Sequence, residues 1–286
     1  MEYLLIIYLL IGCGQGTAKT PDNNTNGTKI SFSELMEIIK KESMEELENV
    51  VGRIDNINEA DENGQTALMY TLESGNVEIS NLLMDNGADI DISNNEWKIR
   101  ALEKAIDNER EGILEILVKK GVDQDVLIDG NKTPLMYASK EGNRKIAEIL
   151  IDGGHQKIDA TDDYGGNALF YSVVGKKGEI LELLVDRGAD MEEEVNGGQK
   201  VLIYAIGDNN IDVMNRLLDK GADIDAVDKS GTTALISAVF ANNEEIVKLL
   251  VDRGAKKDLH YLDKNALAWA EKYKFEAIVN IIKGSE

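Results

Sequence analysis

The chain of 286 residues has few of the residues that catalytic and metal sites use. It contains one Cys and two His, and the two His, His155 and His260, lie about a hundred residues apart. Both fall in predicted turns, and neither has metal-ligand spacing to another candidate. Lys and Arg number 31 against 53 Asp and Glu, a formal net charge of −22. This charge opposes binding to nucleic acid or to anionic lipid, which both require clustered positive charge.

Motifs that carry chemistry are also absent from the sequence. There is no Gly-x-Ser-x-Gly, no Walker A loop and no Gly-rich nucleotide fingerprint. Asp-x-Asp runs suggest calcium, but aligning the nearby glycines with the EF-hand Gly places Tyr70, Met136 or Ser237 where a bidentate Glu is needed. The sequence therefore predicts a protein that is not an enzyme and has no metal or cofactor.

A repeat of 33 to 34 residues dominates the sequence. Its clearest marker is a Gly that follows a Leu-Leu or Leu-Val pair in the cleanest units, and it falls at Gly87, Gly121, Gly154, Gly188, Gly221 and Gly254. A fixed period of this length indicates stacked supersecondary units, each too small to bury its own apolar face. Such proteins present a long surface to another molecule and seldom carry out chemistry.

A second motif gives the structure of each unit. The segment 61–68, Asp-Glu-Asn-Gly-Gln-Thr-Ala-Leu, recurs as 228–235, and a third unit has Thr133-Pro134 at the same place. Its Gly suits a turn with positive φ, and the following Thr suits a helix N-cap. Gly75-Asn76 then ends this helix and starts a second, which ends before the periodic Gly. We therefore expect two short antiparallel helices and a turn finger in each unit.

These motifs resemble those of the ankyrin repeat family, Asp-x-x-Gly-x-Thr-Pro-Leu-His-x-Ala and Leu-Leu-x-x-Gly-Ala-Asp. The resemblance covers nearly everything after residue 30 and implies an all-α solenoid of helix-turn-helix units with β-turn fingers. It implies an N-terminal capping repeat at 31–60, six repeats at 61–258 and a C-terminal capping repeat at 259–286. It also implies a non-catalytic scaffold that binds a protein partner. Capped ends favour a monomer.

Two departures from the family pattern stand out. The family's His after Pro-Leu is replaced in every unit, by Met69, Glu103, Met136, Phe170, Ile203 and Ile236. Apolar packing is therefore expected in place of a ladder of hydrogen-bonded His residues. The second unit is the most divergent, because Trp97 to Leu102 lies where Asn-Gly-Gln-Thr-Ala-Leu is expected.

The N-terminus resembles a bacterial lipoprotein signal. Tyr3 to Ile11 is a short apolar run followed by Gly12-Cys13, too short to span a membrane but suited to a signal peptide. The resemblance implies a signal peptide at 1–12, lipidation of Cys13, a flexible tether at 13–30, and anchoring in the bacterial cell envelope, facing the periplasm or the surface. Met1-Glu2 has no Lys or Arg. A cytoplasmic or host-directed protein that keeps this segment as a strand or helix is the alternative.

Aromatic residues suggest the partner-binding surface. Trp97 and Tyr164 occupy the fingertip position of Asn63 and Ser230, and exposed aromatics are good binding anchors. A column of aromatics also follows the position of the missing His, interrupted by Lys104 and Ser237; its members are Tyr70, Tyr137, Tyr171, Tyr204 and Trp269. The rings of the column either pack between inner helices and fingers, with the tyrosine hydroxyls in contact with water, or line a groove for an extended peptide. The acidic charge favours a partner with a basic or neutral surface.

Overall fold

The computed structural model describes residues 28–90, 95–128, 131–154 and 157–284. The predicted signal peptide, the lipidation site Cys13, nearly all of the tether and His155 lie outside the described residues.

The described residues form sixteen α-helices, arranged as consecutive pairs along the chain. The pairs are α1 (Phe32–Lys40) and α2 (Met44–Val50), α3 (Ala67–Ser74) and α4 (Val77–Asp85), α5 (Asn95–Asp107) and α6 (Glu111–Lys119), α7 (Pro134–Glu141) and α8 (Arg144–Asp152), α9 (Ala168–Val174) and α10 (Gly178–Asp186), α11 (Val201–Gly207) and α12 (Ile211–Asp219), α13 (Ala234–Phe240) and α14 (Glu244–Asp252), and α15 (Ala266–Tyr273) and α16 (Glu276–Lys283). A 3-10 helix, η1 (Val51–Arg53), follows α2, and two antiparallel two-residue strands, β1 (His260–Tyr261) and β2 (Lys264–Asn265), precede α15.

Local signals in the sequence set the ends of these helices as predicted. Thr66, Thr133 and Thr233 are N-caps, and each hydroxyl accepts a hydrogen bond from the N–H three residues later at 3.3 Å. Gly75 and Gly142 end α3 and α7 with φ of +89° and +88°, a conformation that strains other residues. The periodic Gly after each even-numbered helix from α4 to α14 also has positive φ, which confirms its predicted role as the C′ residue.

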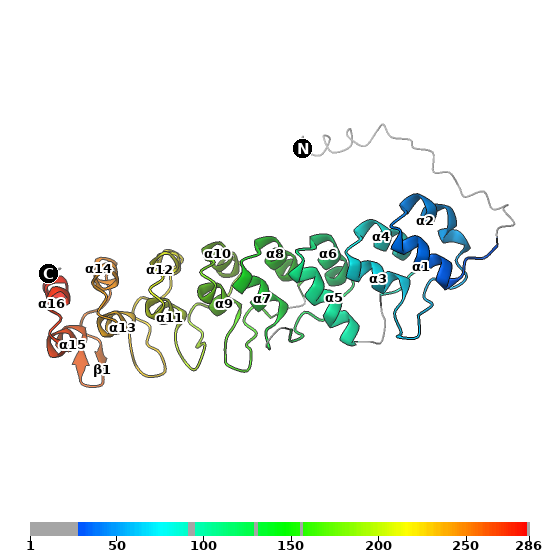
Figure 1. Cartoon of the computed structure of the whole chain (residues 1–286). Helices are drawn as coiled ribbons and strands as arrows, with labels where there is room; N and C mark the ends of the chain where they lie inside the picture. Colours follow the sequence, from blue (N-terminus) through cyan, green and yellow to red (C-terminus); the bar gives the residue numbers. More distant parts are fainter. Residues whose placement is uncertain (1–27, 91–94, 129–130, 155–156, 285–286) are drawn as a thin grey trace, which may run out of the picture.

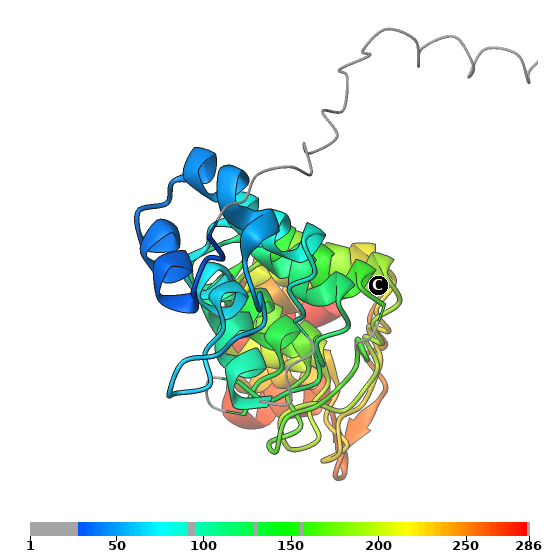
Figure 2. The ribbon, with the colours of Figure 1, turned by 90° about the vertical axis from the view of Figure 1, so that its right-hand side faces the viewer.

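The helices lie in two rows. Each odd-numbered helix contacts the next odd-numbered helix from α1 to α15, and the even-numbered helices form a second row. Figure 1 shows the pairs side by side along an elongated stack, with the connecting fingers all projecting from the side of the odd-numbered row. The view along the stack in Figure 2 places the pairs one behind another. This arrangement confirms the predicted solenoid.

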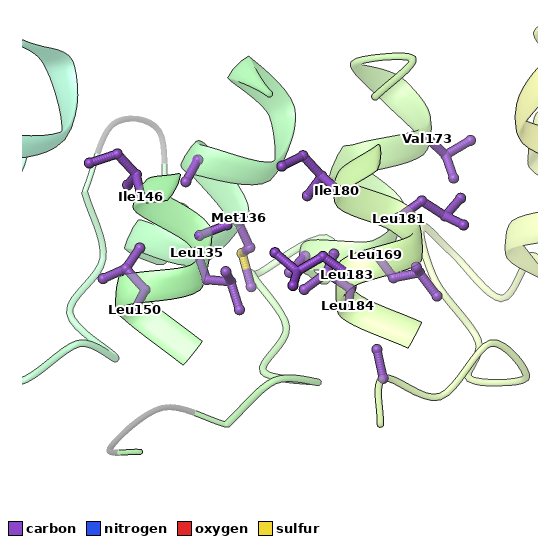
Figure 3. Packing of buried hydrophobic residues seen from close by; sticks show 14 of the residues in the cluster. Leu135, Met136, Ile146, Leu150, Leu169, Val173, Ile180, Leu181, Leu183 and Leu184 are labelled. Atoms are coloured by element: carbon purple, nitrogen blue, oxygen red, sulfur yellow. The ribbon is translucent and has the colours of Figure 1, made fainter. Parts of the chain in front are cut away.

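The core is a continuous apolar ribbon that runs through the stack, from Leu35 in α1 to Ile282 in α16. Figure 3 shows part of it, where side chains of α7 to α10 such as Leu135, Leu150 and Leu184 pack between the helices. Five of the residues that replace the family's His are buried: Met69, Met136, Ile203 and Ile236 in this ribbon, and Phe170, whose ring packs edge-on against Tyr204. The predicted apolar packing at these positions is therefore confirmed, whereas Glu103 is half-exposed.

The second unit differs from the prediction. Ala101 is in register with Ala67, the first residue of α3, but α5 begins six residues earlier, at Asn95. Segment 97–102 has neither the Gly that a finger turn requires nor a capping Thr, so it continues the helix instead. Trp97 consequently lies within α5 with 1% of its surface exposed. Its predicted place at an exposed fingertip is wrong.

Candidate functional site

Three fingers of the stack share one internal geometry. In each of them an Asp carboxylate accepts hydrogen bonds from the N–H groups two and four residues later, at 2.8 to 2.9 Å; these are Asp61, Asp162 and Asp228. The bond from the Gln65 N–H holds the pKa of the Asp61 carboxyl below its usual range. The following Gly64, Gly165 and Gly231 take positive φ at the turn. In these three fingers the tip is thus held by the Asp of the same finger.

Neighbouring fingers are also joined to one another. The Asn196 N–H donates to the Gly165 carbonyl at 3.2 Å, and the Lys229 N–H donates to the Gly198 carbonyl at 2.8 Å. The side chains of Asn131 and Asp163 connect the finger of Gly165 to the finger before it. Because successive fingers are linked, side chains on them keep fixed positions relative to one another.

The predicted column of tyrosines lies on the odd-numbered helices. Tyr70, Tyr137, Tyr171 and Tyr204 come from α3, α7, α9 and α11, and all four are partly buried against the core. Neighbouring helices of this row contact one another, so the four tyrosines recur along the row. The structure therefore makes these residues one repeated feature, and each of them is partly exposed.

Tyr171 connects the column to a finger. Its hydroxyl donates to Asp162 Oδ2 at 2.6 Å, and the Lys132 ammonium lies 5.6 Å from its ring centroid. Burial raises the pKa of the Tyr171 phenol, and the hydrogen bond to Asp162 raises it further. At Tyr171 the structure matches packing between an inner helix and a finger, although the hydroxyl is bonded to Asp162 rather than to water.

The two aromatic residues predicted at fingertips differ in their exposure to solvent. Tyr164 is 74% exposed at the turn of its finger, and its backbone N–H donates to Asp162. Trp97 is buried in α5, as described above, and cannot anchor a partner at the rim. Of the two, only Tyr164 has the accessible position that the sequence predicted.

A cluster of aromatic rings that the sequence pattern did not predict lies at the C-terminal end of the stack. We call it the C-terminal aromatic patch, and its members are Phe240, Tyr261, Trp269, Tyr273 and Phe275. Phe240 packs edge-on against Trp269 with ring centroids 5.1 Å apart, and Tyr273 stacks on Trp269 at 5.7 Å. Four aromatics within 261–275 were the available signal, but Phe240 joins them only through the packing of α13 on α15.

Lysines surround the C-terminal aromatic patch. The Lys272 ammonium lies 4.3 Å from the ring centroid of Trp269, and that of Lys264 lies 5.7 Å from it. Lys264 also forms an ion pair with Asp263, and the hydrogen bond from Lys264 holds the pKa of that carboxyl below its usual range. The electrostatic surroundings therefore differ from those of the acidic chain as a whole.

Within the described ranges, no group of three or more His, Cys, Asp or Glu is arranged to hold a metal ion. Among the helices of the same residues, none is long and apolar enough to cross a membrane. One hollow of about 520 Å³ opens between α6 and α8, lined by residues that include Glu115, Lys145 and Gly153. It belongs to the even-numbered row, on the opposite side of the stack from the fingers.

Comparison with known proteins agrees with this geometry. A family model described as ankyrin repeats in three copies matches residues 35–128, 102–195 and 188–263. Human neurogenic locus notch homolog protein 1 is 26% identical over 140 residues, 49% of this chain and 5% of that protein. The putative ankyrin repeat protein FPV014 of Fowlpox virus is 32% identical over 142 residues, 49% of this chain and 32% of that protein. The chain thus spans a small part of these relatives' length.

Two solved structures have the same fold over most of their length. The ankyrin repeat domain of Bcl-3, described as a unique member of the IkappaB protein family, superposes with a TM-score of 0.67 at 27% identity. The match covers 77% of this chain and 99% of that domain. The ankyrin repeat protein EF0377 superposes with a TM-score of 0.57 at 27% identity, covering 65% of this chain and 97% of that protein.

Proposed function

Because the chain belongs to the ankyrin repeat family, whose model matches it from residue 35 to residue 263, we propose that it is a non-catalytic scaffold that binds a protein partner on its finger side. Proteins built from these repeats generally act as interaction scaffolds, since the stack offers a long, rigid surface to a partner. One observation carries the choice of surface. The partly exposed Tyr70, Tyr137, Tyr171 and Tyr204 recur along the odd-numbered row, and Tyr164 is exposed on the finger whose Asp162 binds the Tyr171 hydroxyl.

The chemistry of this surface suits a protein partner with a basic or neutral face. Tyr supplies a large ring with a polar end and loses little conformational entropy on binding, which makes it a frequent anchor. The chain's net charge of −22 would accelerate association with a basic partner and repel nucleic acid. We also propose that the binding form is a monomer.

Photo-crosslinking in the native cells tests the surface. A photoreactive phenylalanine replaces Tyr164, and in a matched control it replaces Lys145, an exposed residue on α8 in the even-numbered row. We expect a discrete crosslinked protein from position 164 and none from position 145, and loss of the crosslink when Tyr204→Ala is added. Equal crosslinking from both positions, or none from 164, would reject this surface.

We further propose that Cys13 is lipidated and anchors the scaffold in the bacterial cell envelope, so that the lipid is its only membrane contact. The support is the sequence alone: an apolar run, a small residue and then the single Cys of the chain. Labelling with a clickable fatty acid, followed by membrane fractionation of wild type and Cys13→Ala, tests it. Label and membrane association should both disappear in the variant.

The absence of Lys and Arg from Met1-Glu2 favours a second candidate, a cytoplasmic or host-directed ankyrin protein without a cleaved signal. The intact mass of the protein from its native cells distinguishes the two. A mature chain that begins at an acylated Cys13 supports the anchor. An unlabelled chain that retains Met1 supports the alternative and leaves the scaffold role unchanged.

A further inference from the structure

Exposed apolar side chains concentrate at the C-terminal end of the stack. Six large hydrophobic residues are exposed within the described residues, and four of them belong to the last two helix pairs and their fingers: Val227, Phe240, Leu262 and Tyr273. Phe240 and Tyr273 are 38% and 45% exposed and belong to the C-terminal aromatic patch. A contiguous exposed apolar patch on a soluble domain commonly marks an interaction site.

The rings of this patch form a fixed platform. Trp269, which is 6% exposed, lies at its base, and its Nε1 donates to the Tyr261 carbonyl at 3.3 Å. Phe240 and Tyr273 both contact this indole, edge-on and stacked respectively, and their own ring centroids lie 6.2 Å apart. Because Trp269 is held by a hydrogen bond and by packing, a ligand that docks on the outer rings would not have to order them first.

The charge at the patch is opposite to that of the chain. Residues 256–274 contain five Lys against three Asp and Glu, whereas the whole chain has 31 basic against 53 acidic residues. Two of these three acidic groups are already paired, Asp263 with Lys264 and Glu271 with Lys283. Lys272 and Lys274 are exposed and form no ion pair within the described part of the chain.

Lys272 lies beside the rings of the patch. Its ammonium lies 4.3 Å from the Trp269 ring centroid and 5.8 Å from that of Tyr273. The cation–π contacts place the exposed ammonium beside the apolar rings, so a carboxylate can pair with it while a neighbouring apolar group packs on the rings. A ligand that contacts both the rings and this ammonium therefore has to combine apolar and negatively charged groups.

We propose that the C-terminal aromatic patch binds an acidic peptide segment of a partner protein that carries an aromatic or large aliphatic side chain. The apolar side chain packs on Phe240 and Tyr273, and flanking carboxylates pair with Lys272 and Lys274. A membrane surface matches these groups less well, because the chain's net charge of −22 repels anionic lipid. The site rests on the proposed scaffold role and adds a second contact, with the opposite charge preference from the tyrosine column.

Selection of displayed random dodecapeptides on the purified full chain tests the proposal, followed by fluorescence anisotropy with the selected peptides. The variants Lys272→Glu and Phe240→Ala change the patch, and the matched controls are Lys145→Glu and Leu127→Ala, which change an exposed Lys and an exposed apolar residue elsewhere. Circular dichroism confirms that each variant is folded. We expect peptides enriched in Glu and Asp around an aromatic or Leu residue, with binding at least tenfold weaker in each patch variant and within twofold of wild type in the controls.

Several results would overturn the proposal. One is a selection without acidic enrichment, and another is selected peptides that bind Lys272→Glu as well as wild type. Phosphatidylglycerol vesicles that bind the chain through Lys272 would assign the patch to a membrane. A concentration-dependent dimer lost in Lys272→Glu would assign it to a second copy. These variants keep Tyr164 and Tyr204 unchanged. A negative result at the C-terminal aromatic patch would therefore not decide the crosslinking test of the finger surface.

Discussion

Gln124 illustrates how a single residue can reduce the stability of the stack. It follows Gly121 by three residues, the position that Ile90, Met191 and Ile224 occupy in other units. Its side chain is fully buried, and neither its amide nitrogen nor its oxygen has a hydrogen-bond partner in the described part of the chain. Burying an amide without a partner is unfavourable, so this unit has a polar group where the others have an apolar one.

Replacing this amide should stabilise the protein. We expect Gln124→Leu to raise the free energy of unfolding by about 1 kcal/mol, because it removes an unpaired buried group at nearly the same volume. Urea denaturation followed by circular dichroism measures the change. Gln65→Leu is the control, since the Gln65 amide donates to Glu73 and should give no stabilisation. A lower free energy of unfolding for Gln124→Leu would contradict the prediction.

Tyr171 is a second single residue that affects stability, and its contribution to the free energy of unfolding depends on pH. Its pKa is raised in the folded state, so the unfolded chain ionises first as pH rises, and the stabilisation by Tyr171 is complete below about pH 10 and declines above it. Tyr171→Phe should lower the free energy of unfolding by about 1 kcal/mol at pH 7, and this difference from wild type should shrink at pH 11. Urea titrations at both pH values test it, and a difference that grows with pH would contradict it. Tyr204→Phe, whose hydroxyl has no partner in the residues described, should change stability less at pH 7.

Between elements, side chains of one unit bind the backbone of the next. An oxygen on a finger side chain accepts the N–H of a residue 31 positions later, two residues after the periodic Gly, at 2.8 to 3.1 Å. The acceptors within the described residues are Asn58, Asp159, Glu192 and Asp225. These bonds join units at the base of the fingers and fix the spacing of one finger from the next.

Asp258 provides a control for these bonds between units. Asp225 accepts the Lys256 N–H at 2.8 Å, whereas Asp258, at the same register position after Gly254, is exposed and accepts no such N–H within the described residues. Asp225→Ala should therefore lower the free energy of unfolding by about 1 to 2 kcal/mol, and Asp258→Ala by a few tenths. Thermal and urea denaturation of the two variants would show this difference. Equal losses would mean that the bond between units contributes no more to the free energy of unfolding than an exposed carboxylate does.

For the whole molecule, stability should vary along the stack, because each unit contacts only its neighbours. The two Trp residues report on separated parts, Trp97 in α5 and Trp269 in α15. Leu114 is fully buried in α6, next to α5. A cavity at this position should destabilise the N-terminal part more than the C-terminal part.

Single-Trp chains made with Trp97→Phe or Trp269→Phe make this measurable. Adding Leu114→Ala should lower the local free energy of unfolding by about 2 to 5 kcal/mol. The urea midpoint reported by Trp97 should then fall further than that reported by Trp269. Equal shifts of the two midpoints would show that the stack unfolds as one cooperative unit.

Features decided within one repeat could be read from the sequence. The Thr caps, the glycines with positive φ and the paired helices depend on neighbouring residues, so the fold class and the order of elements followed from the periodic motifs. The column position of Tyr70, Tyr137, Tyr171 and Tyr204 also followed from register alone. The exposed fingertip of Tyr164 was predictable because its finger keeps both the Asp and the Gly of the motif.

Features that arise between repeats were decided only by the tertiary structure. Trp97 matched a fingertip in register, but without a turn Gly its segment extends α5 and buries the indole. The C-terminal aromatic patch required α13 to pack on α15, which brings Phe240 onto Trp269. The sequence alone thus determined the repeating unit, whose contacts are local. The packing of each unit on the next decided which aromatic side chains are buried and which remain accessible to a partner.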